Sequence, residues 1–263
     1  MAQYAGVFNA VEGNTTFYAL QPPAVIRKWC EEAPAHLRFC FKFHKEISHE
    51  RRLVGAEDPT REFFARLAPF GDRLGPFFLQ LEDKFGPKEL PALEAYLKAL
   101  PKDHRYIVEV RHEAFFDGGA QERAVDELLG ALGVERVNFD TTGVFAAKGY
   151  DEALREVKHR KPRVPFRATA LGKSPVVRFV GDPVVDNNRP ALTAWAERFA
   201  AWIREGRTPW FFAHHPDDTY APDIARIFQQ RLHELCAAVP APAPWPAEQE
   251  KAERGEQLGL FGA

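Results

Sequence analysis

Seven short segments in which apolar and polar side chains alternate constrain the fold of this sequence more than any other feature. The segment Tyr106–His112 reads Tyr-Ile-Val-Glu-Val-Arg-His, so Glu109 and Arg111 share one face of a strand whose opposite face is wholly apolar. A charge buried in a sheet is costly unless it is paired or hydrogen-bonded. Charges at this place therefore indicate either a structural ion pair or a functional site.

Six further segments repeat this alternation, and in most of them the polar residues come late in the strand. Helical patterns separate the strands, for example Pro23–Glu32 and Gln121–Leu132, the second of which is closed by Gly133. Strands that alternate with helices are typical of the α/β class, and polar strand ends that converge on one rim favour a TIM (β/α) barrel. The six segments are Val7–Gly13, Leu37–Phe43, Pro76–Leu81, Glu135–Asp140, Pro175–Val180 and Thr208–Ala213.

The length and the distribution of proline predict two regions. A chain of 263 residues accommodates one barrel of about 250 residues, and we place it at residues 1–239. Residues 240–263 are predicted to be a Pro-rich linker and a disordered tail, because Pro240–Pro246 alternates proline with other residues and Ala247–Glu256 is charged. Seven strands are one fewer than a complete barrel has, which leaves two edges to be covered.

Composition excludes several classes of protein. The formal net charge of −2 provides no global basic field for nucleic acid, although it permits a local one. Three cysteines, Cys30, Cys40 and Cys236, form no CxxC pair, which is typical of reduced thiols in a cytoplasmic protein. No signal peptide opens the chain, and no apolar run approaches the length that spans a membrane.

Four motifs in order resemble the YecE-like proteins, the domain-of-unknown-function 72 family. They are Val11-Glu12-Gly13-Asn14-Thr15-Thr16-Phe17-Tyr18, Phe41-Lys42-Phe43-His44-Lys45-Glu46-Ile47-Ser48-His49, Leu79-Gln80-Leu81 and Glu109-Val110-Arg111-His112. The resemblance implies a TIM barrel that begins with an additional strand, so the first strand is expected to be absent from this chain. It implies no settled activity, and the family's Asn pair after the last strand is replaced here by His214 and His215.

Polar residues at the strand ends form the candidate site, which could work in three ways. In the first, cations clamp a phosphate or carboxylate, with Asn14, Lys42, Gln80, Arg111, Arg178 and His214 binding the substrate. General acid or base catalysis would then fall to Glu12, Glu109, Asp140, His44 and His112. In the second, Glu12, Glu109, Asp140 and a histidine hold a divalent metal ion. In the third, Glu109 with Arg111 and Glu12 with Lys42 only neutralise one another.

The end of the chain carries a separate signal. Gln257-Leu258-Gly259-Leu260-Phe261 resembles the peptides by which bacterial DNA-maintenance proteins bind the sliding clamp. We expect Gln257, Leu258, Leu260 and Phe261 to make the contacts, because large apolar residues beyond a polar linker are suited to a partner's groove. The alternative is that this peptide folds back on the barrel or frays.

Together these observations predict a hydrolase or lyase that acts on an anionic substrate, such as a phosphodiester or a nucleic-acid component, at the C-terminal mouth of the barrel. The alternative is a non-catalytic ligand-binding or adaptor protein that docks on the clamp through residues 257–261. The sequence identifies neither the substrate nor a metal.

Overall fold

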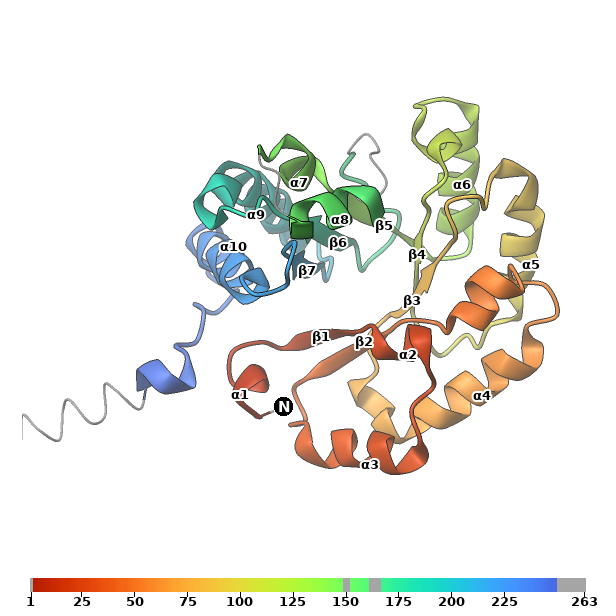
Figure 1. Cartoon of the computed structure of the whole chain (residues 1–263), viewed down its shortest axis with the longest axis horizontal. Helices are drawn as coiled ribbons and strands as arrows, with labels where there is room; N and C mark the ends of the chain where they lie inside the picture. Colours follow the sequence, from red (N-terminus) through yellow and green to blue (C-terminus); the bar gives the residue numbers. More distant parts are fainter. Residues whose placement is uncertain (1, 149–151, 161–166, 250–263) are drawn as a thin grey trace, which may run out of the picture.

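Two parallel β-sheets surrounded by helices form the centre of the protein in a computed structural model, which describes residues 2–148, 152–160 and 167–249 (Figure 1). The larger sheet has five strands in sequential order, and the smaller sheet pairs β1 with β2. The strands are β1 (Ala10–Gly13), β2 (Arg38–Phe41), β3 (Phe77–Gln80), β4 (Tyr106–Glu109), β5 (Glu135–Asp140), β6 (Val176–Val180) and β7 (Trp210–His214). All seven predicted strands are therefore present, several with shorter ends.

Helices connect successive strands, as a right-handed parallel crossover requires. Helix α3 has the predicted bounds, and α4 begins at Glu57, directly after Ala56. A short helix, α1, precedes the first strand. The α-helices are α1 (Ala2–Ala5), α2 (Thr15–Tyr18), α3 (Pro23–Glu32), α4 (Glu57–Leu67), α5 (Leu90–Ala99), α6 (Ala120–Ala131), α7 (Thr142–Ala146), α8 (Glu152–Arg160), α9 (Arg189–Arg204) and α10 (Ala221–Leu235). Shorter helical segments, of 3₁₀ or π type, are η1 (Glu46–Glu50), η2 (Ala68–Arg73), η3 (Pro87–Glu89), η4 (Glu113–Phe116) and η5 (Val185–Asn188).

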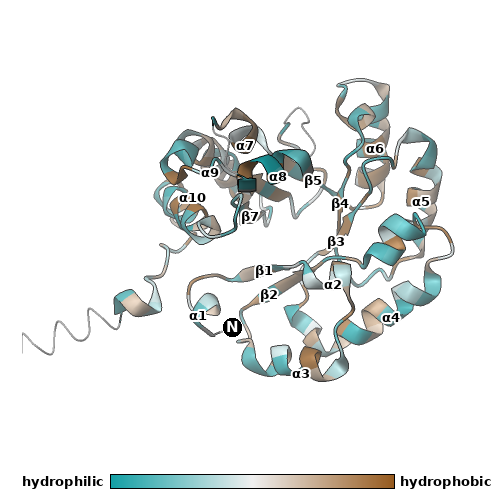
Figure 2. Cartoon of the chain, in the orientation of Figure 1, coloured by the Kyte–Doolittle hydropathy of each residue, from teal (hydrophilic) through white to brown (hydrophobic). Residues whose placement is uncertain are grey.

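The strands separate an inner core from an outer one. Phe39, Phe41 and Phe43 point outward and pack under the helices, as their alternation predicts. Figure 2 shows the strands as the more hydrophobic elements and the exposed sides of the helices as hydrophilic. The inner core is a smaller cluster made of Cys40, Phe78, Ile107, Val137, Val176 and Phe212. Side chains two residues further along these strands therefore lie above this cluster, toward the C-terminal ends.

Strand β5 has the opposite orientation to the one its sequence suggested. Its polar residues point outward, where Arg136 pairs with Asp126 of α6 and Asn138 bonds to Thr169. The prediction that Asp140 faces the mouth is wrong. Its carboxylate accepts hydrogen bonds from Thr142 and from the indole of Trp195 on α9. The inward positions on this strand belong to Val137 and Phe139 instead.

The two sheets do not form one continuous hydrogen-bonded barrel. Two isolated parallel bridges connect the β2 region to β3 and the residues just before it. They pair Phe39 with Leu74 and Lys42 with Phe78. Within the described residues, no strand pairing joins β7 to β1. The described strands are thus a five-stranded curled half-barrel and a separate two-stranded sheet, rather than a closed ring.

The Pro-rich segment after α10 is held against the barrel. Arg226 of α10 donates to the carbonyl of Ala243 and lies over the ring of Trp245, which also meets Phe8 at 5.8 Å. The clamp-like peptide 257–261 lies outside the described residues.

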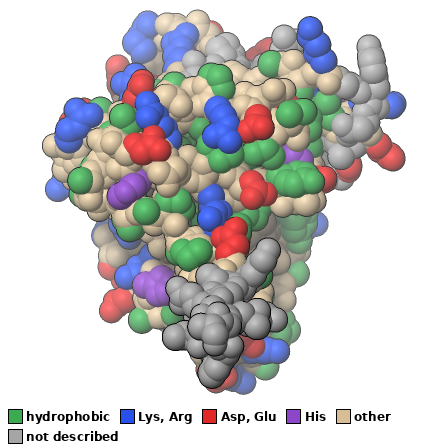
Figure 3. Space-filling view, turned by 90° about the vertical axis from the view of Figure 1, so that its left-hand side faces the viewer, with side chains coloured by type: hydrophobic (Ala, Val, Ile, Leu, Met, Phe, Trp, Pro, Cys, Tyr) green, Lys and Arg blue, Asp and Glu red, His purple; other side chains and the backbone are tan. Residues whose placement is uncertain are grey.

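Among the described residues, no helix is long and apolar enough to cross a membrane. Figure 3 shows basic and acidic side chains interspersed on one face, without a patch of a single sign.

Candidate functional site

A chain of buried ion pairs joins the two sheets, with Arg178 of β6 at its centre. Its guanidinium donates twice to Glu12, at 2.8 Å for both Nε–Oε2 and Nη2–Oε1. The remaining Nη1 donates to Glu109 at 2.7 Å. The other oxygen of Glu109 accepts from Nε of Arg111 at 2.7 Å. Three strands far apart in sequence thereby supply one continuous charged network, and four of the residues proposed for the site lie in it.

The strand register explains why these side chains converge. Gln80 pairs with Glu109 across β3 and β4, and Phe139 pairs with Arg178 across β5 and β6. Residues in register point to the same side of a parallel sheet. The guanidinium of Arg178 lies over the rings of Phe78 and Phe139, at 5.0 and 5.5 Å, so aromatic faces as well as carboxylates surround the buried charge.

Electrostatics keep this network ionised. Burial alone would raise the pKa of Glu12, but the guanidinium of Arg178, aided by His214, outweighs it and holds that pKa well below its usual range. Burial likewise lowers the pKa of Arg178, yet Glu12 and Glu109 together raise it. A carboxylate with a strongly depressed pKa is a poor proton acceptor near neutral pH. The geometry therefore favours a positioning role for Glu12 over the general base that its sequence position suggested.

Lys42 lies beside this network but does not join it. The residue is 6% exposed, and its Nζ lies 4.7 Å from the ring centre of Phe17 and 5.1 Å from that of Phe78. Its ammonium has no ion pair or hydrogen bond within the described part of the chain. Burial, followed by repulsion from Arg178, lowers the pKa of Lys42 to about 7. The expected pairing of Lys42 with Glu12 is thus wrong, because Arg178 takes both oxygens of that carboxylate.

Local contacts fix the backbone that carries Lys42. The hydroxyl of Thr16 donates to the carbonyl of Lys42 at 2.6 Å and lies 3.0 Å from the carbonyl of Gly13, so it ties the ends of β1 and β2 together. A Cβ on Gly13 would lie 2.6 Å from the ring of Phe41, which explains why only glycine fits there. The motif that begins at Glu12 therefore builds one wall of the site.

Two residues of the site lie on short helical segments, where the alternation of strands does not apply. Phe17, on α2, covers Lys42 and meets the imidazole of His49 at 5.0 Å. The Nδ1 of His49 lies 2.8 Å from Oγ of Ser48. Burial, then Arg111, lowers the pKa of His49, so the ring is neutral at neutral pH. The motif Phe41–His49 contains this histidine, but nothing in its spacing predicts where the loop places it.

The other predicted site residues divide between the network and the loops around it. His214 approaches Glu12, with Nε2 to Oε2 at 3.3 Å, and Gln80 is buried on β3 at the level of Glu109. His44 and His112 each accept a hydrogen bond from a backbone amide two residues ahead, as loop-capping groups do. Asn14 precedes α2 without a side-chain cap bond.

The arrangement does not suit the predicted metal centre. Arg178 lies between the two carboxylates that were expected to share the ion, and Asp140 is turned away toward Trp195. No group of three or more His, Cys, Asp or Glu side chains that could hold a metal occurs among the residues the structure describes. A guanidinium between two ligands repels a cation, so no step is assigned to a metal here.

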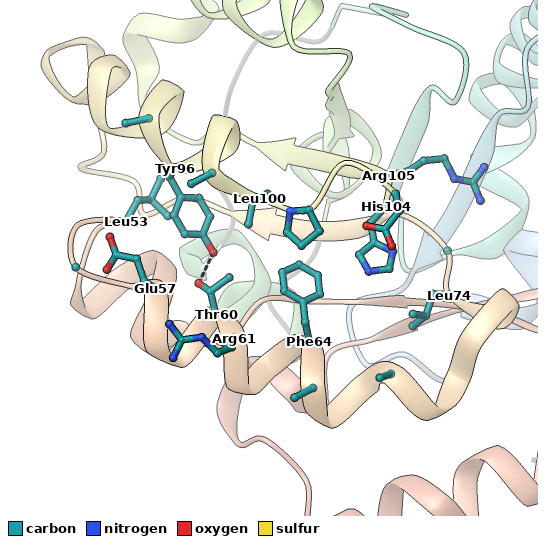
Figure 4. A pocket seen from close by; sticks show the side chains of 18 of the residues that line it. Leu53, Glu57, Thr60, Arg61, Phe64, Leu74, Tyr96, Leu100, His104 and Arg105 are labelled. Carbon is teal, nitrogen blue, oxygen red and sulfur yellow. Dashed lines mark hydrogen bonds between the residues drawn. The ribbon is translucent and has the colours of Figure 1, made fainter.

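A large groove on the described surface lies elsewhere, between α4 and α5 on the outer side of the five-stranded sheet (Figure 4). It has a volume of about 1160 Å³. Alanines and the apolar side chains of Leu53, Phe64 and Leu100 line much of it, and Thr60 bonds to the hydroxyl of Tyr96 across it. The buried ion-pair network does not reach this groove, so its size alone does not make it the chemical site.

Comparison with known proteins places the chain in a family. Residues 1–250 match the model described as "Protein of unknown function DUF72". The chain belongs to the DUF72 family. It is 40% identical over 244 residues to the UPF0759 protein YecE of Escherichia coli strain K12, and 39% identical to that of strain O157:H7; each match covers 92% of this chain and 89% of the relative.

Solved DUF72 structures resemble the fold more than the sequence. A DUF72 family protein of Enterococcus faecalis V583 has a TM-score of 0.67 at 16% identity, covering 92% of this chain and 89% of that one. A DUF72 family protein of Thermotoga maritima MSB8 has a TM-score of 0.53 at 15% identity, with 84% of each chain covered. The resemblance to YecE-like proteins seen in the four motifs is thus confirmed, and it brings no activity with it.

Proposed function

We propose that this DUF72 protein is an enzyme, a hydrolase or lyase, that binds a small anionic substrate at Lys42 and Arg111, which follow the C-terminal ends of β2 and β4. The observation that carries the proposal is the buried amine of Lys42, which has no carboxylate partner among the described residues although two carboxylates lie close by. A buried cation without a partner is costly, and an anionic ligand would supply one.

The charges of the network point to the same sign of ligand. The carboxylates of Glu12 and Glu109 are matched by the guanidiniums of Arg178 and Arg111. Protonated Lys42 therefore adds one positive charge that this set does not neutralise. Arg111 uses only Nε toward Glu109, and its two Nη groups have no hydrogen-bond partner in the described ranges. Such a free fork suits the two oxygens of a carboxylate or phosphate.

Each residue then has a role of its own. Lys42 and Arg111 bind the anion, and Gln80, which lies in register with Glu109, orients it. His49 and His214 border the network, and the neutral imidazole of His49 can accept and return a proton near neutral pH. Glu12 and Glu109 hold the cations in place. Asp140 has no part in the chemistry.

Anion titration tests this proposal. Isothermal titration of the protein with inorganic phosphate, acetate and a dinucleotide phosphodiester should show binding of at least one anion, which weakens at least tenfold in Lys42→Met and in Arg111→Met. Lys98→Met is the matched control, because Lys98 pairs with Glu94 on the exposed side of α5. Absence of binding for every anion, or equal affinity in Lys42→Met and the parent, would refute the proposal.

We further propose that the two sheets are an incomplete TIM barrel. The bridge between Lys42 and Phe78 supports it, as do the side-chain bonds from Arg178 of β6 to Glu12 of β1 across the open seam. A chain extended by one strand at its N-terminus should then pair that strand with the edge of β1 or β7. Hydrogen exchange at the amides of Trp210–His214 measures it, and unchanged protection of both edges would count against the proposal.

Docking on the bacterial sliding clamp stays a second proposal, supported by the sequence of residues 257–261. The contacts of Trp245 with Phe8 and Arg226 hold the preceding Pro-rich segment against the rest of the protein. Titration of the full-length protein against purified clamp should show binding that is lost in Leu260→Ala combined with Phe261→Ala. An intact interaction in the double variant would refute it.

A further inference from the structure

The surroundings of the Lys42 amine differ from those of the lysines that form ion pairs in the described part of the chain. Lys28, Lys45 and Lys98 each pair with a glutamate at the surface. Lys42 instead lies between the faces of Phe17 and Phe78, almost wholly buried and without a carboxylate within ion-pair distance in the described ranges. A lysine that only balanced charge would be expected to contact the carboxylates beside it.

Aromatic walls and a neighbouring guanidinium are the two conditions that make a lysine amine nucleophilic. Removal of water disfavours the ammonium, and a nearby cation disfavours it further. Here the rings of Phe17 and Phe78 exclude water, while Arg178 lies over the same Phe78 ring at 5.0 Å. Lowering of the Lys42 pKa to about 7 agrees with this geometry, since a substantial fraction of the amine is then unprotonated at neutral pH.

The residues around Lys42 can also bind the electrophile with which such an amine would react. The two unused Nη groups of Arg111 can hold a carboxylate or phosphate. His49, which shares the Phe17 ring with Lys42, can deliver a proton. A carbonyl carbon on an anion held by Arg111 would thus lie close to the amine of Lys42.

We propose that Lys42 forms an imine with an aldehyde or ketone that carries a carboxylate or phosphate. The Nζ–C bond forms as the C=O π bond breaks, and one proton moves from nitrogen to oxygen. The C–O bond then breaks and water leaves, with one further proton supplied from solvent through His49. The product is a protonated imine, whose positive charge the carboxylates of Glu109 and Glu12 stabilise. This inference rests on the proposed anion site and identifies its substrate class as carbonyl-bearing anions.

Reductive trapping with glyoxylate tests the imine directly. Native protein is incubated with glyoxylate and sodium cyanoborohydride, and peptide mass spectrometry measures N-carboxymethylation at each lysine. Lys42 should react at least tenfold faster than the exposed Lys98, the rate should rise with pH around 7, and inorganic phosphate should slow it. Phe17→Leu, which admits water, should move the pH midpoint upward. Labelling of Lys42 only in denatured protein would overturn the inference.

Two further outcomes separate this inference from the anion site on which it rests. If phosphate binds as proposed but Lys42 is labelled no faster than Lys98, the imine is refuted and the anion site stands. If neither phosphate binds nor Lys42 is labelled, both proposals fail. Rapid labelling that phosphate does not slow would overturn the assignment of the carbonyl compound as an anion held by Arg111.

Discussion

Replacing Arg178 with methionine tests the buried network most directly. Methionine keeps much of the side-chain volume but removes the donors that satisfy both oxygens of Glu12 and one of Glu109. Glu109 retains Arg111, whereas Glu12 keeps, among the described residues, only His214 at 3.3 Å. Removing one partner of a buried ion pair typically costs 3–5 kcal/mol, so we expect Arg178→Met to lower the free energy of unfolding by about 4 kcal/mol at pH 7.

The pH dependence distinguishes this explanation from a simple packing defect. In the parent, the depressed pKa of Glu12 contributes stability above the unfolded value of about 4.3, and that contribution is lost as the pH falls through the folded value. In Arg178→Met, burial instead raises the pKa of Glu12, so protonation relieves the penalty as the pH falls. The difference in stability between the two proteins should therefore shrink below about pH 5.

Urea unfolding at pH 7 and at pH 4 measures both effects. Arg61→Met is the matched control, because Arg61 pairs with Asp58 on an exposed face of α4 and such pairs contribute at most about 1 kcal/mol. A deficit in Arg178→Met that is below about 1 kcal/mol, or that is the same at both pH values, would show that this network does not stabilise the fold through its charges.

Three further perturbations have separate readouts. Between pH 7 and 10 the unfolded chain binds a proton at Lys42 that the folded chain lacks, so parent stability in urea should rise relative to Lys42→Met by up to about 1.4 kcal/mol per pH unit; parallel pH profiles would contradict this. Asp140→Ala removes the acceptor of the Trp195 indole and should cost about 1–3 kcal/mol in urea unfolding while anion affinity by calorimetry stays unchanged; a tenfold loss of affinity would restore Asp140 to the site. Gly13→Ala places a methyl group against Phe41 and should lower the thermal midpoint by the equivalent of about 1–3 kcal/mol, whereas an unchanged midpoint would mean that the strand ends adjust freely.

The inner face of most strands could be predicted from the sequence because one face is clearly apolar. On β4 the alternation leaves Glu109 and Arg111 together, and on β6 it isolates Arg178 between two valines, so both placements are confirmed. The same rule failed on β5. That strand carries polar side chains that serve the outer layer, including Arg136 against Glu122 and Asp126, and alternation alone does not tell the inside of a barrel from the outside.

The positions of Phe17 and His49 could not be predicted from the sequence, for a different reason. Phe17 and His49 belong to short irregular turns whose path depends on contacts across the barrel rather than on a local period. The partner of Glu12 was also unpredictable, since Lys42 and Arg178 are both inward cations and only their positions in space decide which one reaches the carboxylate. Strand periodicity thus identified the charged residues but not how they pair.

Because no backbone pairing joins β7 to β1 among the described strands, Arg178 has a second, structural role. Backbone hydrogen bonds join every other neighbouring pair of described strands, although β2 and β3 are joined only through isolated bridges. Between β1 and the last two strands, the described bonds from Arg178 and His214 to Glu12 are made by side chains. Those bonds hold the two-stranded sheet against β6 and β7. A change in the charge of Glu12, or a ligand that competes for Arg178, would weaken these side-chain bonds. We therefore expect binding next to Arg178 to change how the two-stranded sheet sits against the five-stranded one.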